Sequence, residues 1–529
     1  MGTLCPPGHD VHGGRALGGA VSYPPSLQEP ELDPKPILEL PLEKLVQKLL
    51  ADELSLESVL CSYLEEAMKV HQEVNCLTDF LDECEEQLQA LKKLKKSERG
   101  LLYGVPISLK DGHDSTCGLA QFLEKPAAKD GVIVKVLKAQ GAIPFVKTNI
   151  SQTLFDCSNP IYGQTLNPQN LKKTSGGSSG GEGALLAKGG SILGMGTDTG
   201  GSIRIPASFC GACGIRVTGY RLSNSGVASA VKGRKAVVTV AGPLAWDVES
   251  LALCLRALLS EHMHRLDPTV PFLPFREEVY SSNRPLRIGY YESDGFTQPS
   301  PSMARAVKLT SRLLQDAGHQ VGLLGPWEGD QISENAGLVH SWRGRLHLSF
   351  KGDIVDPSMK NTVTSLRLPN SLKRFLAWIW KYFVSVGSDD LCQSHLSRLP
   401  LFLQEYQQEF IAKWRSLDLD VLLSPALDPA FYVGYPAKVQ GDSFYLGLYN
   451  LLNFPAGVVP VTTVTPQDEK ELAFYRGYYR DHVDKSFQEV RSVGLSVAVQ
   501  CIALPWEEEL CLRFMKEVET LVKSKMEPK

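Results

Sequence analysis

Hydrophobic and polar residues follow two different spacings along this chain. Between residues 37 and 95 apolar positions recur at intervals of three and four, and one such stripe consists of Val59, Leu60, Tyr63, Leu64 and Ala67. This spacing is typical of one face of an amphipathic helix, and Pro41 suits a first helical turn. Residues 37–95 are therefore predicted to form N-terminal helices that pack on the body. Residues 1–36 are rich in Gly, Pro and Ser, which predicts a flexible segment.

From residue 103 the pattern changes to short apolar runs that alternate with helical stretches. The runs VPISLK and AIPFVKTN flank a helical stretch near residues 131–140, which predicts a strand, a helix and a second strand. The same order returns in a helix from about Val248 capped by Asp247, the strand LRIGYY, a helix that ends before Gly318 and the strand LDVLLSP. We therefore expect residues 96–529 to form an α/β domain, a twisted mixed β-sheet surrounded by α-helices.

The composition narrows the classes of partner. The chain has 55 Lys and Arg residues against 59 Asp and Glu residues, a net charge of -4 that does not indicate a nucleic acid partner. Its 12 cysteines include one CxxC pair, Cys210 and Cys213, so reduced, buried thiols are expected rather than a disulfide scaffold or a zinc site. We find no secretory signal and no run of about 18 apolar residues. The chain is expected to face the cytoplasm and to contact membranes only peripherally.

The densest chemical signal lies in residues 175–204. They read SGGSSGGEGALLAKGGSILGMGTDTGGSIR, in which two clusters of Gly and Ser flank an apolar segment. Glycine allows a backbone to approach a ligand closely, so the clusters are interpreted as two loops that converge on one site. A flexible linker is disfavoured because GALLA and SILGMG need burial. A phosphate-binding loop is disfavoured because Glu182 stands where that pattern requires Lys.

Two kinds of serine nucleophile fit these loops. Ser178 lies at the centre of a GxSxG pattern, the nucleophile elbow of α/β hydrolases, with a downstream histidine such as His482 as its base. That elbow needs a buried strand directly before the serine, whereas the preceding NPQNLKKTS is polar and contains a proline. Without a histidine the serine needs another base, and Lys110 at the end of YGVPISLKD can serve if burial favours its neutral amine. A salt bridge with Asp111 is the alternative role for Lys110.

The motifs YGVPISLKD, NPIYGQTLNP and the stretch from GGSSGG to GYRLS resemble the amidase signature family in order and approximate spacing. Further segments, including DVESLALCLRALL and ALPWEEELCLRFMKEVE, are similar to its membrane-associated fatty acid amide hydrolase branch. The resemblance covers residues 37–529 and implies the amidase signature fold. It also implies hydrolysis of fatty acid amides, such as N-acylethanolamines and primary fatty amides, to fatty acid and amine, without metal or organic cofactor, by a homodimer.

The resemblance further implies a Ser-Ser-Lys triad. Ser202 would be the nucleophile that forms an acyl-enzyme, Ser178 would relay its proton, and Lys110 would be the base. Phe155 would line the substrate site. The backbone amides expected to form the oxyanion hole are those of Thr199, Gly200, Gly201 and Ser202. The residues expected to support these loops without reacting are Ser179, Asp198 and Arg204.

A membrane-binding helical cap is predicted near residues 366–386. In SLKRFLAWIWKYFVSV, one helical side carries Leu372, Phe375, Leu376, Ile379, Trp380 and Phe383. Such a helix can lie in the membrane interface, although an ordinary buried helix shows the same stripe. Because the resemblance implies a docking cap at this position, we expect a peripheral protein on the cytoplasmic face of endomembranes.

Three departures from the family pattern keep other functions open. The chain is a few residues shorter directly after Lys110, it lacks residues near Phe155, and it has Arg216, Val217 and Thr218 where the family has KPT. The first departure adjoins the proposed base. A catalytically weakened lipid-amide binding protein and an amidase for small polar amides are therefore the alternatives.

Overall fold

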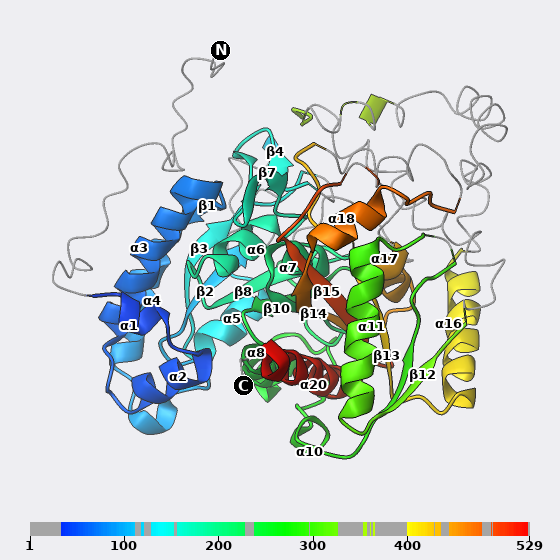
Figure 1. The fold of residues 1–529 in the computed structure, drawn as a ribbon. Coiled ribbons are helices and arrows are strands. Elements are labelled where there is room, and N and C mark those ends of the chain that lie inside the picture. Colours follow the sequence, from blue (N-terminus) through cyan, green and yellow to red (C-terminus); the bar gives the residue numbers. More distant parts are fainter. Residues whose placement is uncertain are drawn as a thin grey trace, which may run out of the picture.

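The fold is built on one large mixed sheet (Figure 1). The computed structural model describes residues 33–111, 118–120, 129–152, 156–227, 237–295, 297–325, 353–356, 360, 363–364, 399–427, 429–434, 444–478, 488 and 490–526. Within them an 11-stranded sheet has the order β1-β3-β2-β8-β10-β9-β14-β15-β13-β11-β12. Its strands are β1 (Leu77–Phe80), β2 (Pro106–Lys110), β3 (Ile143–Thr148), β8 (Leu193–Asp198), β9 (Cys213–Arg216), β10 (Val240–Ala245), β11 (Arg287–Tyr290), β12 (Gln320–Leu323), β13 (Val421–Pro425), β14 (Ala456–Thr463) and β15 (Ser496–Ile502).

Helices and two small sheets surround this large sheet. The small sheets pair β4 (Ser158–Asn159) with β5 (Gly163–Gln164), and β6 (Leu166–Asn167) with β7 (Asn170–Thr174). The α-helices are α1 (Lys35–Leu38), α2 (Leu42–Leu50), α3 (Leu56–Val74), α4 (Glu83–Lys92), α5 (Val132–Ala139), α6 (Gly180–Ala187), α7 (Arg204–Cys210), α8 (Val248–Leu258), α9 (Glu261–Leu266), α10 (Glu277–Tyr280), α11 (Pro301–Asp316), α16 (Leu399–Ser416), α17 (Phe444–Leu451), α18 (Pro466–Leu472) and α20 (Glu508–Met526). The predicted α/β architecture is confirmed.

The local patterns form the elements that they predict. Strands β2 and β3 are parallel neighbours joined through α5, as VPISLK and AIPFVKTN predict. Strand β11, helix α11 and strand β13 form where LRIGYY, the helix that ends before Gly318 and LDVLLSP were predicted. The Asp247 side chain accepts a hydrogen bond from the Ser250 amide and so caps α8 as expected. Helix α3 buries its predicted apolar stripe.

The N-terminal region differs from the prediction in two details. Pro41 is the N-cap of α2 rather than part of its first turn, since the helix begins at Leu42. Residues 37–95 also contribute a strand, because β1 pairs antiparallel with β3 at one edge of the large sheet. The apolar residues around β1 have helical spacing, so its strand was not predicted. This strand depends on its pairing with β3, which is distant in the sequence.

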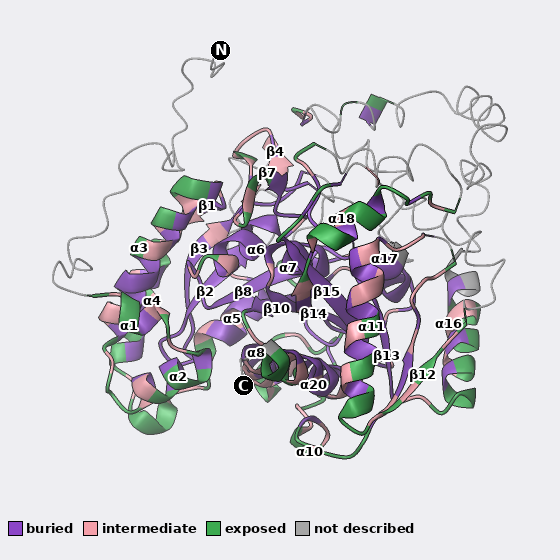
Figure 2. Cartoon of the chain, in the orientation of Figure 1, coloured by how far each residue is buried: buried purple, intermediate pink, exposed green. Residues whose placement is uncertain are grey.

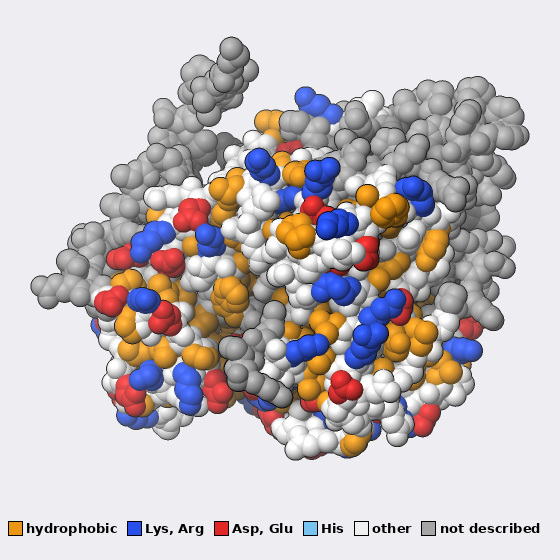
Figure 3. Space-filling view, viewed as in Figure 1, with side chains coloured by type: hydrophobic (Ala, Val, Ile, Leu, Met, Phe, Trp, Pro, Cys, Tyr) orange, Lys and Arg blue, Asp and Glu red, His pale blue; other side chains and the backbone are white. Residues whose placement is uncertain are grey.

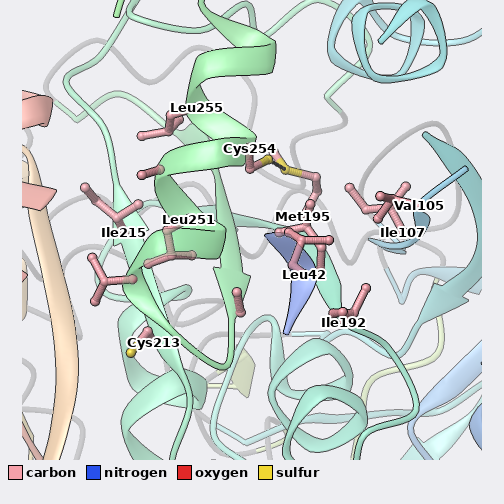
Figure 4. Close-up of a cluster of buried hydrophobic side chains, with 14 of the residues drawn as sticks. Leu42, Val105, Ile107, Ile192, Met195, Cys213, Ile215, Leu251, Cys254 and Leu255 are labelled. Atoms are coloured by element: carbon pink, nitrogen blue, oxygen red, sulfur yellow. Dashed lines mark hydrogen bonds between the residues drawn. The ribbon is translucent and has the colours of Figure 1, made fainter. Parts of the chain in front are cut away.

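The two faces of the sheet at β8 contact different kinds of side chain. Met195 lies against Cys254 of α8, with sulfur atoms 3.9 Å apart, in a cluster that includes Ile107 of β2 (Figure 4). Gly194 and Gly196 alternate with Met195 and therefore point to the opposite face. A Cβ on Gly194 would meet the Glu182 carboxyl and Ser108 Oγ, and a Cβ on Gly196 would meet Leu244 and Ser179 Oγ. One face of the sheet is thus apolar, and the other admits polar side chains close to the strand backbone.

Burial is deepest around the middle strands of the sheet, where Figure 2 shows almost continuous burial. Among the described residues, nine cysteines are free and buried, which agrees with the buried thiols predicted from their scattered positions in the sequence. On the surface shown in Figure 3, basic and acidic side chains are interspersed.

The described helices include none with the length and apolar character needed to cross a bilayer. The predicted cap at residues 366–386 lies outside the described residues.

Candidate active site

Lys110 ends β2 with its side chain fully buried. Its Nζ donates to Ser178 Oγ at 2.7 Å, to Thr197 Oγ1 at 2.9 Å and to the Thr197 carbonyl at 3.3 Å. These partners come from the GGSS loop and from β8, so the strand end meets both Gly/Ser segments. The residues directly after Asp111 lie outside the described part of the chain.

The GGSS loop connects β7 to α6. The peptide bond between Gly177 and Ser178 is cis, and the Ser178 carbonyl accepts from the Ser151 amide at 3.3 Å. Ser178 is partly exposed, whereas Ser179 is fully buried and hydrogen bonds through Oγ with the Thr197 backbone at 3.4 Å. Ser179 therefore anchors the loop to β8 and leaves Ser178 facing Lys110.

The second loop follows β8 and carries Ser202, which is 4% exposed. Its carbonyl accepts from the Ser179 amide at 3.1 Å, a contact that holds the two Gly/Ser loops together. Gly201 has a φ of 109°, a value that strongly favours glycine, and its amide donates to Asp198 Oδ1 at 2.8 Å. The structure thus brings Lys110, Ser178 and the Ser202 loop into one buried region.

A buried ion pair braces the Ser202 loop. Both carboxylate oxygens of Asp198 accept from Arg204, at 3.1 and 3.2 Å, and the carboxylate also binds the amides of Gly201 and Ile203. Burial raises the pKa of a carboxyl, but the Arg204 charge and these hydrogen bonds outweigh burial and hold the pKa of Asp198 well below its usual range. Asp198 is therefore a permanent anion that fixes the loop.

The partners of this ion pair come from distant parts of the chain. Asn450 Nδ2 donates to Asp198 Oδ1 at 2.7 Å, and Arg204 donates to Asn450 Oδ1 and Gln500 Oε1. Arg216 is also fully buried and donates to the Tyr449 carbonyl at 2.8 Å. Nothing local in the sequence identifies Asn450 or Gln500 as partners of the Ser202 loop.

Glu182 forms a second polar layer beneath Lys110. Its fully buried carboxyl accepts from Ser108 Oγ at 2.5 Å and from Thr148 Oγ1 at 2.8 Å. Burial raises the pKa of Glu182 to about 7, although the two hydroxyls and the charge of Lys110 act in the opposite direction. In the sequence alone Glu182 excludes a phosphate loop but shows no partner. The alternating glycines of LGMGTD were the signal that a polar group approaches this strand.

Contrary to the expectation from sequence, a strand precedes the GGSS loop. NLKKT forms β7, which the polar composition and the nearby proline did not suggest. That strand pairs with β6 in a two-stranded sheet outside the large sheet, and its early residues are exposed. His482 and Phe155 lie outside the described residues. The contact that the structure assigns to the Ser178 hydroxyl is with a lysine.

Gly181 supports the site by allowing α6 to approach β3. A Cβ on Gly181 would lie 2.4 Å from the Asn149 amide nitrogen and 2.6 Å from the Cys76 carbonyl oxygen. Both atoms are backbone and cannot turn aside, so Gly181→Ala is expected to destabilise the protein by about 2 to 4 kcal/mol. Urea unfolding measures the change. Gly189→Ala, at a position with open space but a φ of 77°, is the control and should cost about 1 kcal/mol. Equal effects would contradict the packing argument.

A fully buried lysine bonded to a partly exposed serine, beside a second glycine-rich serine loop on a mixed α/β sheet, defines a candidate serine hydrolase that uses lysine instead of histidine. A family model described as Amidase matches residues 58–512, and the chain belongs to this amidase family.

Two curated proteins and one solved structure are similar over much of the chain. "Fatty-acid amide hydrolase 1" of Sus scrofa is 51% identical over 520 residues, which cover 95% of this chain and 89% of that protein. "Vitamin D3 hydroxylase-associated protein" of Gallus gallus is 55% identical over 355 residues, which cover 65% of this chain and 76% of that protein. A solved structure titled "Fatty acid amide hydrolase" has a TM-score of 0.75 at 26% identity, covering 94% of this chain and 87% of that one.

Proposed function

We propose that this amidase hydrolyses fatty acid amides to fatty acid and amine through an acyl-enzyme on Ser202. The single observation that carries the mechanism is the 2.7 Å contact from Lys110 Nζ to Ser178 Oγ, next to a loop whose Ser202 carbonyl is held by the Ser179 amide. The similarity to the fatty-acid amide hydrolase of Sus scrofa supports the substrate class.

The proposed chemistry begins with Lys110 in its neutral form. Its Nζ accepts the Ser178 proton while Ser178 Oγ accepts the proton of Ser202, and Ser202 Oγ attacks the amide carbonyl carbon. The proton on Lys110 then returns through Ser178 to the leaving nitrogen as the C–N bond breaks. Water attacks the resulting ester by the same relay and releases the fatty acid, so that no proton is gained or lost over the cycle.

The developing oxyanion needs donors on the Ser202 loop. We propose the amides of Thr199, Gly200, Gly201 and Ser202 for this role, because glycines let amides point at one place without Cβ obstruction. The Gly201 amide already donates to Asp198, so a carbonyl oxygen must compete with that carboxylate for it. The other three amides are therefore the stronger candidates.

The acyl chain and the site of action are further proposals. We place Phe155 along the acyl chain and the cap at residues 366–386 on a membrane surface. The protein would then be a peripheral protein on the cytoplasmic face of endomembranes. We also propose that it is a homodimer. The aromatic stripe between Leu372 and Phe383 supports the membrane contact.

The substrate class can be tested by comparing amides of different acyl length. Purified protein is incubated with a long-chain N-acylethanolamine, a long-chain primary amide and acetamide, and amine release is measured. Each buried methylene contributes about 0.8 kcal/mol of binding free energy, so kcat/KM for the long-chain amides should exceed that for acetamide by about 100-fold or more.

Ser202→Ala supplies the blank for each substrate. Faster hydrolysis of acetamide would favour an amidase for small polar amides. Saturable binding of a long-chain amide without any amine release would favour a lipid-amide binding protein.

A further inference from the structure

We propose that Glu182 is a positioning residue for Lys110: its carboxylate, held between Ser108 and Thr148, compensates the positive charge that Lys110 acquires when it accepts a proton. This inference rests on the proposed function of Lys110 as the base. It assigns a role to a buried acid that neither the triad nor the oxyanion hole uses.

The strand geometry places the carboxyl under Lys110. Ser108 and Lys110 are two residues apart on β2, so their side chains leave the same face of the sheet. Thr148 is the β3 residue paired with Lys110 in the parallel register. Glu182 Oε2 accepts from Ser108 and Oε1 accepts from Thr148. The two anchors of the carboxyl are therefore the neighbour of Lys110 along the strand and its neighbour across the sheet.

Strand β8 contributes the space for this carboxyl. Gly194 is paired with Ser108, and a Cβ at Gly194 would lie 2.0 Å from Glu182 Oε2 and 2.8 Å from Ser108 Oγ. Any larger residue would displace the carboxyl from Ser108. The absence of a side chain at this buried strand position is explained by the need to seat Glu182 against the strand.

Besides Asp111, which follows Lys110 in the chain and is buried, two buried thiols of the described residues lie near this layer. Cys76, next to the start of β1, faces Glu182, and burial raises the pKa of its thiol well above the usual value. Cys157 faces Lys110, and burial raises the pKa of its thiol to about 11. Both thiols remain neutral at neutral pH. Glu182 is ionised above about pH 7, so its charge is present throughout the alkaline range in which a lysine base operates.

An opposite charge near an amine favours the ammonium form and makes the amine a stronger base. In attack by Ser202 the proton moves toward Lys110, and the Glu182 carboxylate offsets the charge that develops there. Without it, Lys110 would become neutral at lower pH but would accept the proton less readily. Loss of the charge should therefore change both the position and the height of the pH profile.

The test is the pH dependence of Ser202 acylation by a fluorophosphonate probe in wild type and Glu182→Gln. The rate of acylation should rise with pH as Lys110 becomes neutral. In the variant this alkaline rise should move about one pH unit toward acid, the lower end of the effect of a neighbouring opposite charge on a pKa. Its plateau should fall about threefold, as expected for a weaker base. The two profiles then cross, which a general loss of active protein would not produce. Superimposable profiles would overturn the proposal.

Three further variants separate the possible failures. Lys110→Ala must abolish the labelling of Ser202; if labelling persists, the proposed function itself is wrong. Asp111→Asn tests the other acid beside Lys110; a shift with Asp111→Asn and none with Glu182→Gln would overturn the assignment to Glu182. Glu65→Gln, at an exposed position of α3, is the charge control and should leave the profile unchanged.

Ser108→Ala carries the test if Glu182→Gln does not fold. This variant keeps the charge and removes one donor, which raises the pKa of Glu182 further above its usual range. In wild type the ionisation of Glu182 should add an inflection near pH 7 to the acylation profile. In Ser108→Ala this inflection should move toward alkaline pH while the rise due to Lys110 stays in place. An unmoved inflection would contradict the role of Glu182.

Discussion

Ser202→Ala is expected to lower the hydrolysis of a long-chain amide by about 10⁴- to 10⁶-fold and to abolish labelling by a fluorophosphonate probe. The substitution removes only the hydroxyl that is proposed to form the acyl-enzyme, so the loss measures the chemistry of that oxygen. Lys110→Ala should cause a loss of similar order, since residues that act as one unit are not additive. Peptide mapping of labelled wild-type protein identifies the modified serine.

Ser208→Ala is the matched control for this experiment. Ser208 is buried on α7, six positions after Ser202, and should keep both labelling and turnover within about twofold of wild type. Labelling of Ser178 in wild-type protein would instead favour a nucleophile elbow. Folded protein that is not labelled at all would favour a lipid-amide binding function.

Asp198→Ala is expected to destabilise the protein by about 3 to 5 kcal/mol, the range seen when one partner of a buried ion pair is removed. The substitution leaves the fully buried Arg204 guanidinium without its counter-charge and the amides of Gly201 and Ile203 without their acceptor. The free energy of unfolding from urea titration measures the loss. Asp198→Asn keeps the shape and should cost less than Asp198→Ala, because the amide oxygen can still accept.

The pH dependence gives an independent check on Asp198. Its folded pKa lies well below that of the unfolded chain, so its contribution to stability is fully present above the unfolded value of about 4. That contribution is lost as the pH falls from there through the folded pKa. Wild type should therefore lose more stability than Asp198→Asn between about pH 5 and pH 2. Equal acid sensitivity would contradict a strongly stabilised carboxylate.

Asp52→Ala is the exposed control. Asp52 pairs with Lys96 and Arg99 on the surface, and solvent screening leaves such a pair with little effect on the free energy of unfolding. A loss at Asp52 equal to that at Asp198 would show that burial does not decide the cost.

The secondary structure was largely predictable where local patterns were strong. The stripe on α3, the buried run of β2 and the Asp247 cap of α8 each depend on residues within a few positions of one another. Strands β1 and β7 were not predicted. β1 has only four residues and depends on its pairing with β3, and β7 has exposed lysine and leucine side chains because it belongs to a small peripheral sheet.

The site was predicted unevenly for a similar reason. Lys110, Ser178 and Ser202 lie in motifs that resemble a known family, so their order along the chain was enough to name them. Their roles remain proposals, and Phe155 and the cap at residues 366–386 lie outside the described residues. Glu182 was visible in the sequence but had no evident partner, since Ser108 and Thr148 reach it only across the sheet.

The sequence by itself determined the class of fold, the family and the loops that hold the proposed chemistry, because spacing and motifs are properties of neighbouring residues. The tertiary structure alone decided which groups share a charge or a hydrogen bond. Asp198 meets Asn450 and Arg204 meets Gln500 through side chains more than 240 positions apart. Glu182 rests under Lys110 because a glycine of β8 leaves room for it. Such contacts arise from the register of strands and the approach of helices, which depend on the packing of the whole chain.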